Sequence, residues 1–374
     1  MKGERYKVKG IGRAIIVALL FTFHLSPLTS HLSPFTSSAL AQPTHYAVSG
    51  TAGTVIATNG SPFDGHANTG GIDVAALWSH DDTSIFWHRF WDEPMIGVRM
   101  NYAHIWNSVA GDRLGLAWTL NGPLIGHLSW TYSVGLSMYT KPYSVTHDTS
   151  NSYIGSPLNC LIDLGFMYEL PLSERLTATL TAKLVHSSNG YLYKPNHGLN
   201  YLQAELGLRY GTARRHYRHR PSFFGDSTFH AYGRPFLLLA PGAVMSRYDD
   251  IDDIIFYPTY LLQLGYIRQV HPCFAIGGAL DLSYNFSHRR MAPEGELPVY
   301  PAAFGFFDTR WGALTLRLGL AHYLAYYPLN WEQYYERVAV YYRIGDAGHH
   351  LVGAGMKVHY DHIDFIEWSY IYEF

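Results

Sequence analysis

The stretch ALTLRLGLAHYL, residues 313–324, alternates between two kinds of side chain along its whole length. One row is made of leucines: Leu314, Leu316, Leu318, Leu320 and Leu324. The other row is polar or small: Thr315, Arg317, Gly319 and Ala321. Because side chains alternate with period two along a strand, one row would meet lipid and the other a polar interior. This pattern is typical of a strand in a transmembrane β-barrel.

The same parity recurs from about residue 95 to the C-terminus, in segments of roughly ten residues separated by turn residues. Further examples are 96–102, 337–344 and 352–358. A soluble sandwich would alternate similarly, but it would rarely run so many strands in sequence. We expect an all-β fold, a transmembrane antiparallel barrel of about fourteen strands, within a range of roughly twelve to sixteen.

The composition and the C-terminus both favour an outer-membrane location. Only 15% of the residues are charged, against about 25% in ordinary globular proteins, and 30 are tyrosines. With a net charge of -2 the overall composition is not basic, so nothing points to nucleic acid as a partner. The chain ends DFIEWSYIYEF, with an aromatic-rich row that finishes at Phe374. Such a terminal strand resembles the signal that outer-membrane assembly machinery reads, so we expect the bacterial outer membrane.

The chain divides into three expected parts. Residues 1–41 read as a signal peptide, with a basic start, an apolar core at 15–23 and a cleavage site at Ala39-Leu40-Ala41. Residues 42–92 are expected to be extra strands or a plug, and 93–374 the barrel. Short periplasmic turns alternate with longer extracellular loops, but the connection at 212–231 is long on the periplasmic side.

Three polar residues fall on rows that should face lipid. The apolar row of strand 176–184 continues to His186 and Ser188 in the stretch HSSNG, and the next strand places Asn200 on its apolar row. A polar group there needs a partner or a purpose. An imidazole can activate a serine, and a carboxamide can fix the imidazole tautomer. Asn189 and Gly190 are candidate oxyanion donors.

The alternative interpretation is a barrel rim without chemistry. In that case, His186 and Ser188 reach the membrane interface, and Asn189 and Gly190 only form the loop.

The motif His186-x-Ser188-Asn189, followed by KPNHG at 194–198, resembles the His-x-Ser-Asn…Pro-Asn-x-Gly motif of the lipid A 3-O-deacylase (PagL) family. The segments GLSMYTKPY (135–143) and IGSPLN (154–159) resemble its longer relatives, the acyloxyacyl hydrolases. The resemblance covers about residues 90 to 210. It implies Ser188 as nucleophile and His186 as base on the outside of a barrel, with Asn196 supporting the loop.

The substrate implied by the resemblance is lipid A, or lipopolysaccharide, in the outer leaflet. An ester-linked (3-hydroxy)acyl chain would be removed. One departure concerns the third member of the triad, where the family has a glutamate twelve residues after the serine and this chain has Asn200. Asparagine is what outer-membrane phospholipase A uses with its own His-x-Ser-Asn-Gly. A phospholipase A-like enzyme and a non-enzymatic channel or structural barrel therefore remain alternatives.

We expect no cofactor, no catalytic metal and no nucleic-acid partner, and we leave a homodimer open. The histidines show no metal-ligand spacing. Cys160 and Cys273 are expected not to bond to each other, because the topology places them at opposite ends of the barrel. Asp163, Lys183 and Glu205 fall on inward rows of three neighbouring strands and are expected to form a polar network inside the barrel.

Overall fold

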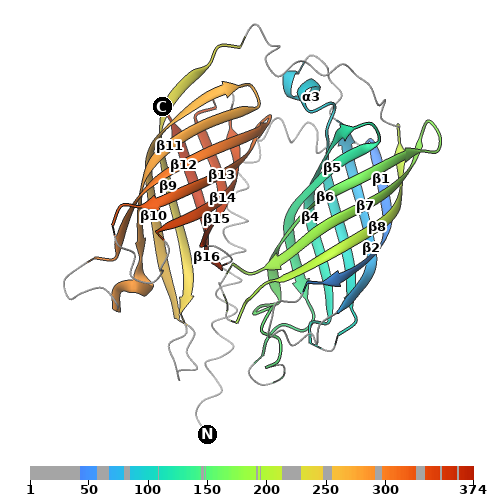
Figure 1. Ribbon diagram of the computed structural model, residues 1–374, viewed down its shortest axis with the longest axis horizontal. Coiled ribbons are helices and arrows are strands. Elements are labelled where there is room, and N and C mark those ends of the chain that lie inside the picture. The colour runs from blue at the N-terminus through green and yellow to red at the C-terminus, as the bar shows by residue number, and fades with distance from the viewer. Residues whose placement is uncertain are drawn as a thin grey trace.

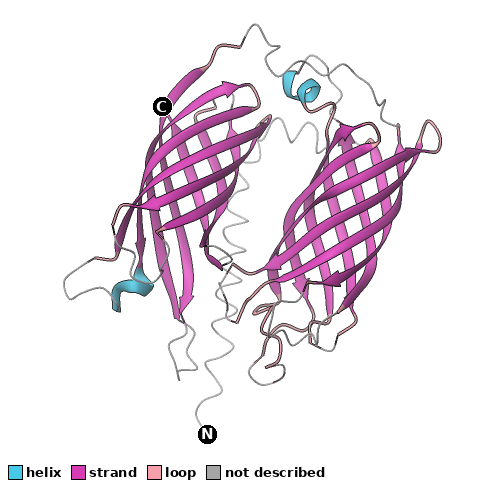
Figure 2. Cartoon of the chain, in the orientation of Figure 1, coloured by secondary structure: helices cyan, strands magenta, loops and turns pink. Residues whose placement is uncertain are grey.

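The computed structural model describes residues 43–374 except 57–66, 80–84, 108, 145–146, 148, 191–192, 194, 213–228, 247–254, 291–296, 326–332, 346–347 and 360–361. The expected signal peptide, 1–41, lies outside these residues. The described part is almost entirely strand, with one short α-helix, α3 (Phe86–Phe90), and one 3-10 helix, η2 (Phe286–Arg290) (Figure 2). Neither of these helices has the length needed to cross a bilayer.

The strands form two separate closed barrels of eight antiparallel strands each (Figure 1). The first barrel runs in chain order: β1 (His45–Val55), β2 (Asn68–Ser79), β3 (Met95–Ile105), β4 (Asp112–Ile125), β5 (Leu128–Tyr139), β6 (Leu158–Pro171), β7 (Leu176–Ser188) and β8 (Leu199–Gly211). It closes where β1 pairs with β8, from His45 opposite Gly211 to Val55 opposite Tyr201.

The second barrel contains the remaining eight strands: β9 (Tyr232–Ser246), β10 (Ile255–His271), β11 (Phe274–Asn285), β12 (Val299–Trp311), β13 (Leu314–Tyr323), β14 (Tyr334–Ile344), β15 (His350–His359) and β16 (His362–Glu373). It closes where β16 pairs with β9. Residue pairs in that seam include Tyr370 with Leu239 and Tyr372 with Leu237.

The all-β, antiparallel barrel fold class is therefore confirmed, and the sixteen described strands are divided between two barrels of eight. The number of barrels differs from the expectation of one barrel over 93–374. Alternation along each strand is the same in one large barrel as in two small ones, so it does not reveal where a sheet closes. Closure depends on β1, which lies within 42–92. That segment supplies two strands of the first barrel, β1 and β2.

The two-barrel arrangement also explains the long connection on the periplasmic side. β8 ends at Gly211 and β9 begins at Tyr232, so residues 212–231 lead from one closed barrel to the next. A hairpin turn would suffice between two strands of one barrel. A connection between two barrels has to span from one sheet to another, which needs more residues.

Side chains fill both barrel interiors, as expected for a barrel of only eight strands. In the first barrel, Arg99 pairs with Asp163, and the Lys183 ammonium lies 2.5 Å from Glu205. In the second barrel, Arg317 makes two hydrogen bonds to Asp308, of 2.8 and 3.0 Å. The expected network of Asp163, Lys183 and Glu205 is thus present, and these charges are paired.

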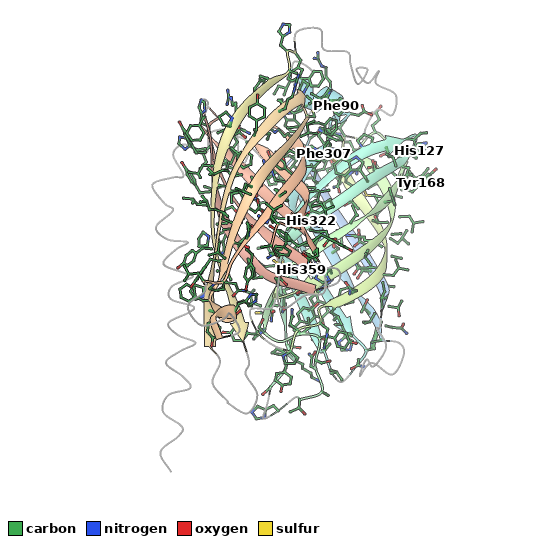
Figure 3. All side chains as sticks on the ribbon, turned by 60° about the vertical axis from the view of Figure 1, so that its left-hand side comes forward. Phe90, His127, Tyr168, Phe307, His322 and His359 are labelled. Carbon is green, nitrogen blue, oxygen red and sulfur yellow. The ribbon has the colours of Figure 1, made fainter. Side chains whose placement is uncertain are left out.

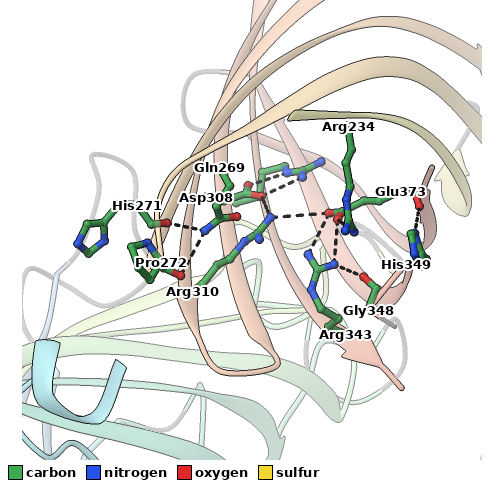
Figure 4. Close-up of polar contacts among 11 residues, drawn as sticks. Arg234, Gln269, His271, Pro272, Asp308, Arg310, Arg343, Gly348, His349 and Glu373 are labelled. Carbon is green, nitrogen blue, oxygen red and sulfur yellow. Dashed lines mark hydrogen bonds and ion pairs between the residues drawn. The ribbon is translucent and has the colours of Figure 1, made fainter. Parts of the chain in front are cut away.

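A second group of ion pairs lies at the rim of the second barrel that carries the C-terminus (Figure 4). Arg343 donates to both carboxylate oxygens of Glu373, at 2.8 and 2.9 Å. Arg310 lies 3.7 Å from the same carboxylate. These contacts join the ends of β12 and β14 to the last residue of β16.

The short helix α3 lies between β2 and β3 of the first barrel and packs against the second barrel. This contact is at the end that carries the short turns, which this class of fold places in the periplasm. Just after α3, the indole Nε1 of Trp91 donates to the backbone carbonyl of Arg310 at 3.3 Å. The Trp91 ring lies 5.5 Å from that of Trp311 in the second barrel and 6.2 Å from that of Trp130 in the first. Phe90, marked in Figure 3, packs 5.6 Å from Phe274. An aromatic cluster from three parts of the chain thus joins the barrels.

Candidate active site

The β7–β8 hairpin places the predicted histidine and asparagine directly opposite each other. In the ladder, His186 pairs with Asn200 and Ser187 with Leu199. Residues of β7 with odd numbers are buried in the interior, whereas Leu180, Ala182 and Leu184 are exposed. His186 continues the outward row and is half-buried. His186 therefore lies on the outward row of β7, as the alternation of the sequence predicts.

The hydrogen bonds of His186 leave one ring nitrogen free. Nδ1 lies 2.8 Å from Oδ1 of Asn200. Since a carboxamide oxygen can only accept, Nδ1 carries the proton and Nε2 keeps its lone pair. Nε2 is buried and has no hydrogen-bond partner. This is the tautomer that a general base for a serine hydroxyl needs.

Ser188 lies at the end of the same row and is only 3% exposed. Its Oγ accepts two hydrogen bonds, from the backbone N–H of Gly190 at 3.1 Å and from Nδ2 of Asn196 at 2.9 Å. Two donors from the loop that follows β7 therefore converge on the candidate nucleophile. Donors in this position can also serve a developing negative charge.

The amide of Asn196 is oriented by its neighbour Asn189. Oδ1 of Asn196 accepts from the backbone N–H of Asn189 at 3.3 Å, so Nδ2 points to Ser188. The Asn189 side chain itself turns away from the serine, donating to Oγ of Ser156 at 3.1 Å and to the carbonyl of Tyr193 at 3.0 Å. Asn189 thus holds the loop, and the two donors at Ser188 come from Gly190 and Asn196.

The stretch IGSPLN, at the start of β6, packs against this loop. A Cβ at Gly155 would lie 2.3 Å from the carbonyl of Pro195, which leaves room for glycine alone. Gly198 has a φ of +73° and lies against the imidazole Cε1 of His186. The glycines of both sequence motifs therefore allow close backbone approach around the site.

Some neighbours of the site were not predicted from the sequence. Cys160 of β6 pairs with Ser188 in the ladder, and its thiol, like that of Cys273, is free. Ile366 of β16 contacts Gly190 from the second barrel, since a Cβ on Gly190 would lie 2.4 Å from its Cγ1. The register of the β6–β7 hairpin would predict that Cys160 lies beside Ser188. No local sequence signal indicates Ile366, because the contact joins separate barrels.

The inward neighbours of the site are not candidates for the triad. Glu205 accepts from Nε2 of Gln203 at 2.8 Å inside the first barrel and pairs with Lys183. Ser187 also points inward, with its Oγ 3.2 Å from that of Ser137. Within the described residues, no three His, Cys, Asp or Glu side chains gather in a way that could hold a metal ion.

Two family models match the chain in succession. The model for lipid A 3-O-deacylase (PagL) matches residues 76–209, and that for the acyloxyacyl hydrolase C-terminal domain matches 228–374. The boundary between them falls in the connection between the two barrels. No curated protein matches the sequence.

Among solved structures, one of the outer-membrane enzyme PagL is similar to 43% of this chain and 97% of its own, with 16% identity and a TM-score of 0.31. A mutant porin from Rh. blastica is similar over 88% of this chain and 98% of its own, with 12% identity and a TM-score of 0.18. From the two consecutive family matches and the barrels that they cover, the chain belongs to the PagL and acyloxyacyl hydrolase family and is an outer-membrane hydrolase of that family.

Proposed function

We propose that this protein removes an ester-linked (3-hydroxy)acyl chain from lipid A, with Ser188 as nucleophile, His186 as base and Asn200 as the group that orients His186. The observation that carries the proposal is the free, buried Nε2 of His186 on the same outward row as Ser188. The opposite nitrogen is held at 2.8 Å by Asn200. Family membership supports the lipid A substrate.

The reaction begins when Nε2 of His186 takes the Ser188 hydroxyl proton and Oγ attacks the ester carbonyl carbon. The carbonyl oxygen becomes an oxyanion, which accepts hydrogen bonds from Gly190 N–H and Nδ2 of Asn196. Collapse of this intermediate breaks the ester C–O bond, and protonated His186 gives its proton to the departing oxygen of the sugar or acyl backbone, which leaves as a hydroxyl. Water then hydrolyses the acyl-enzyme with His186 as base, which releases the fatty acid.

In the absence of substrate, both loop donors point at Ser188 Oγ, and no hydrogen bond joins Oγ to His186. A substrate carbonyl that takes over these donors would free the hydroxyl to turn toward Nε2. Catalytic hydrogen bonds commonly tighten only when substrate binds. The outward position of His186 lets an acyl ester reach the site from the outer leaflet.

The side chains inside the two barrels argue against the alternative of a channel. Both interiors contain large buried side chains; those under 2% exposed include Arg113, Arg317, Arg337, Tyr139, Tyr201, Tyr323, Tyr335 and Tyr341. Interiors packed in this way leave no wide path for water or ions.

Mass spectrometry of lipid A from cells that express each variant tests the proposal. Wild type is expected to lower the lipid A mass by one hydroxyacyl group, and Ser188→Ala is expected to leave it unchanged. Ser187→Ala is the matched control, because its hydroxyl points into the barrel. Full deacylation by Ser188→Ala refutes the mechanism. Unchanged lipid A with loss of phospholipid acyl chains in wild type alone would support the phospholipase A-like alternative instead.

A further inference from the structure

The second barrel reaches the candidate active site of the first barrel. Gly190, whose N–H donates to Ser188 Oγ, packs against Ile366 near the start of β16. The contact leaves no room for a side chain on Gly190. Ile366 is half-buried, whereas Trp368, the next residue on the same outward row, is 68% exposed.

Ile366 lies near the start of β16, and Figure 1 shows that this part of β16 is at the end of the barrel away from α3. The aromatic cluster around Trp91 follows directly after α3. Among the described residues, the two barrels therefore touch at two separated places, one near each end. Two contacts restrain a rotation that one contact alone would permit. Ile366 is therefore held at a defined position beside the loop that carries Gly190 and Asn196.

The outward row of β16 runs in the same direction that a bound acyl chain would take from Ser188. From Ile366 the outward row continues through Trp368 and Tyr370 to the C-terminal, periplasmic end. It therefore runs into the membrane from the level of Ser188. An acyl chain whose ester carbonyl lies at Ser188 would also run from that level into the membrane.

We propose that Ile366 forms one wall of the site that holds the acyl chain, so that the second barrel selects which chain the first barrel removes. This proposal rests on the proposed esterase function. The substrate feature that it selects is the length and bulk of the acyl group next to the scissile carbonyl. Shortening the side chain at 366 would widen the site, and lengthening it would narrow the site. A difference of a methylene or two in an apolar pocket commonly changes relative rates roughly tenfold or more.

The test uses the purified full-length chain in detergent micelles with two probes, p-nitrophenyl butyrate and p-nitrophenyl laurate. The measured quantity is the ratio of kcat/KM for laurate to that for butyrate. Ile366→Ala is expected to raise this ratio about fivefold to tenfold and Ile366→Trp to lower it by a similar factor. The ratio is independent of the fraction of correctly folded protein, which matters if either variant assembles poorly.

Leu264→Ala is the matched control, since Leu264 is an exposed aliphatic residue on the outward row of β10. Its ratio is expected to equal that of wild type. If Ile366 only supports the loop, both rates fall together and the ratio stays constant, which overturns the inference. If hydrolysis by wild type does not depend on Ser188, as judged with Ser188→Ala, the proposed function itself is wrong.

Discussion

Asn200 lies opposite His186 in the β7–β8 ladder, and its side-chain oxygen is 2.8 Å from Nδ1 of the imidazole. Both side chains belong to the outward row of the barrel. The register of a single hairpin therefore sets the tautomer of the candidate base. A neutral carboxamide does this without adding a charge to a surface that faces lipid, where an unpaired carboxylate is costly.

Replacing Asn200 by alanine is expected to lower kcat by about 10²-fold or more, because the imidazole loses the group that fixes its tautomer and orientation. Asn200→Asp keeps an acceptor at the same place and is expected to retain most of the activity. Ester hydrolysis by the purified variants measures both effects. Leu202→Ala, two residues further on the same outward row, is the control and should behave as wild type. Equal activity of Asn200→Ala and wild type would remove Asn200 from the mechanism.

Asn196→Ala tests whether the loop amide stabilises the transition state. Loss of one oxyanion donor typically costs about 10²- to 10³-fold in kcat, with little change in KM. Nδ2 of Asn196, at 2.9 Å from Ser188 Oγ, is the side-chain donor in this site. Steady-state kinetics with a soluble ester separates the two parameters. A rise in KM alone would instead indicate that Asn196 contributes to substrate binding.

Much of the candidate site could be predicted from the sequence because it lies within one hairpin. Alternation places His186 and Ser188 on the outward row, and a regular hairpin brings Asn200 beside them. The hydrogen-bond donors around Ser188 are harder to predict from the sequence. Asn189 and Gly190 are the donors that the sequence suggests, and the structure shows the Asn189 side chain bonded to Ser156. The orientation of the Asn196 amide depends on a three-dimensional network that the sequence does not encode.

The barrel architecture was only partly predictable for a related reason. Each strand encodes which row faces lipid, but closure depends on pairing between distant strands, such as β1 with β8. The long connection at 212–231 was the one local sign of a division between barrels. The proximity of Ile366 to Gly190 depends on the packing of one closed barrel against another, which alternation does not encode.

Cys273 is expected to resist thiol reagents. It lies in the turn between β10 and β11, fully buried, and burial raises the pKa of its thiol to about 12. Alkylation requires the thiolate, which is a negligible fraction at any pH well below that pKa. In a Cys160→Ala background, maleimide labelling at pH 8 should be very slow in the folded protein and complete after denaturation. Rapid labelling of the folded protein would show that the turn opens.

The contact between the barrels is tested by combining substitutions at both of its residues. Gly190→Ala places a Cβ 2.4 Å from Cγ1 of Ile366 and also puts a side chain at a φ of +62°. The backbone strain alone costs about 1–2 kcal/mol. We expect Gly190→Ala to lose most of its activity, because the loop must move away from Ser188.

Adding Ile366→Ala removes the atoms that the new Cβ would meet, so the double variant is expected to regain part of the lost activity. The recovery stays incomplete, since the strain at φ remains. Residues in contact typically show a coupling of about 0.5–3 kcal/mol in such a cycle, whereas distant residues are additive. The cycle of Gly190→Ala with Leu264→Ala provides the additive reference. If the effects of the two substitutions on activity are additive in both cycles, Ile366 does not contact the loop at Gly190 in the assembled protein.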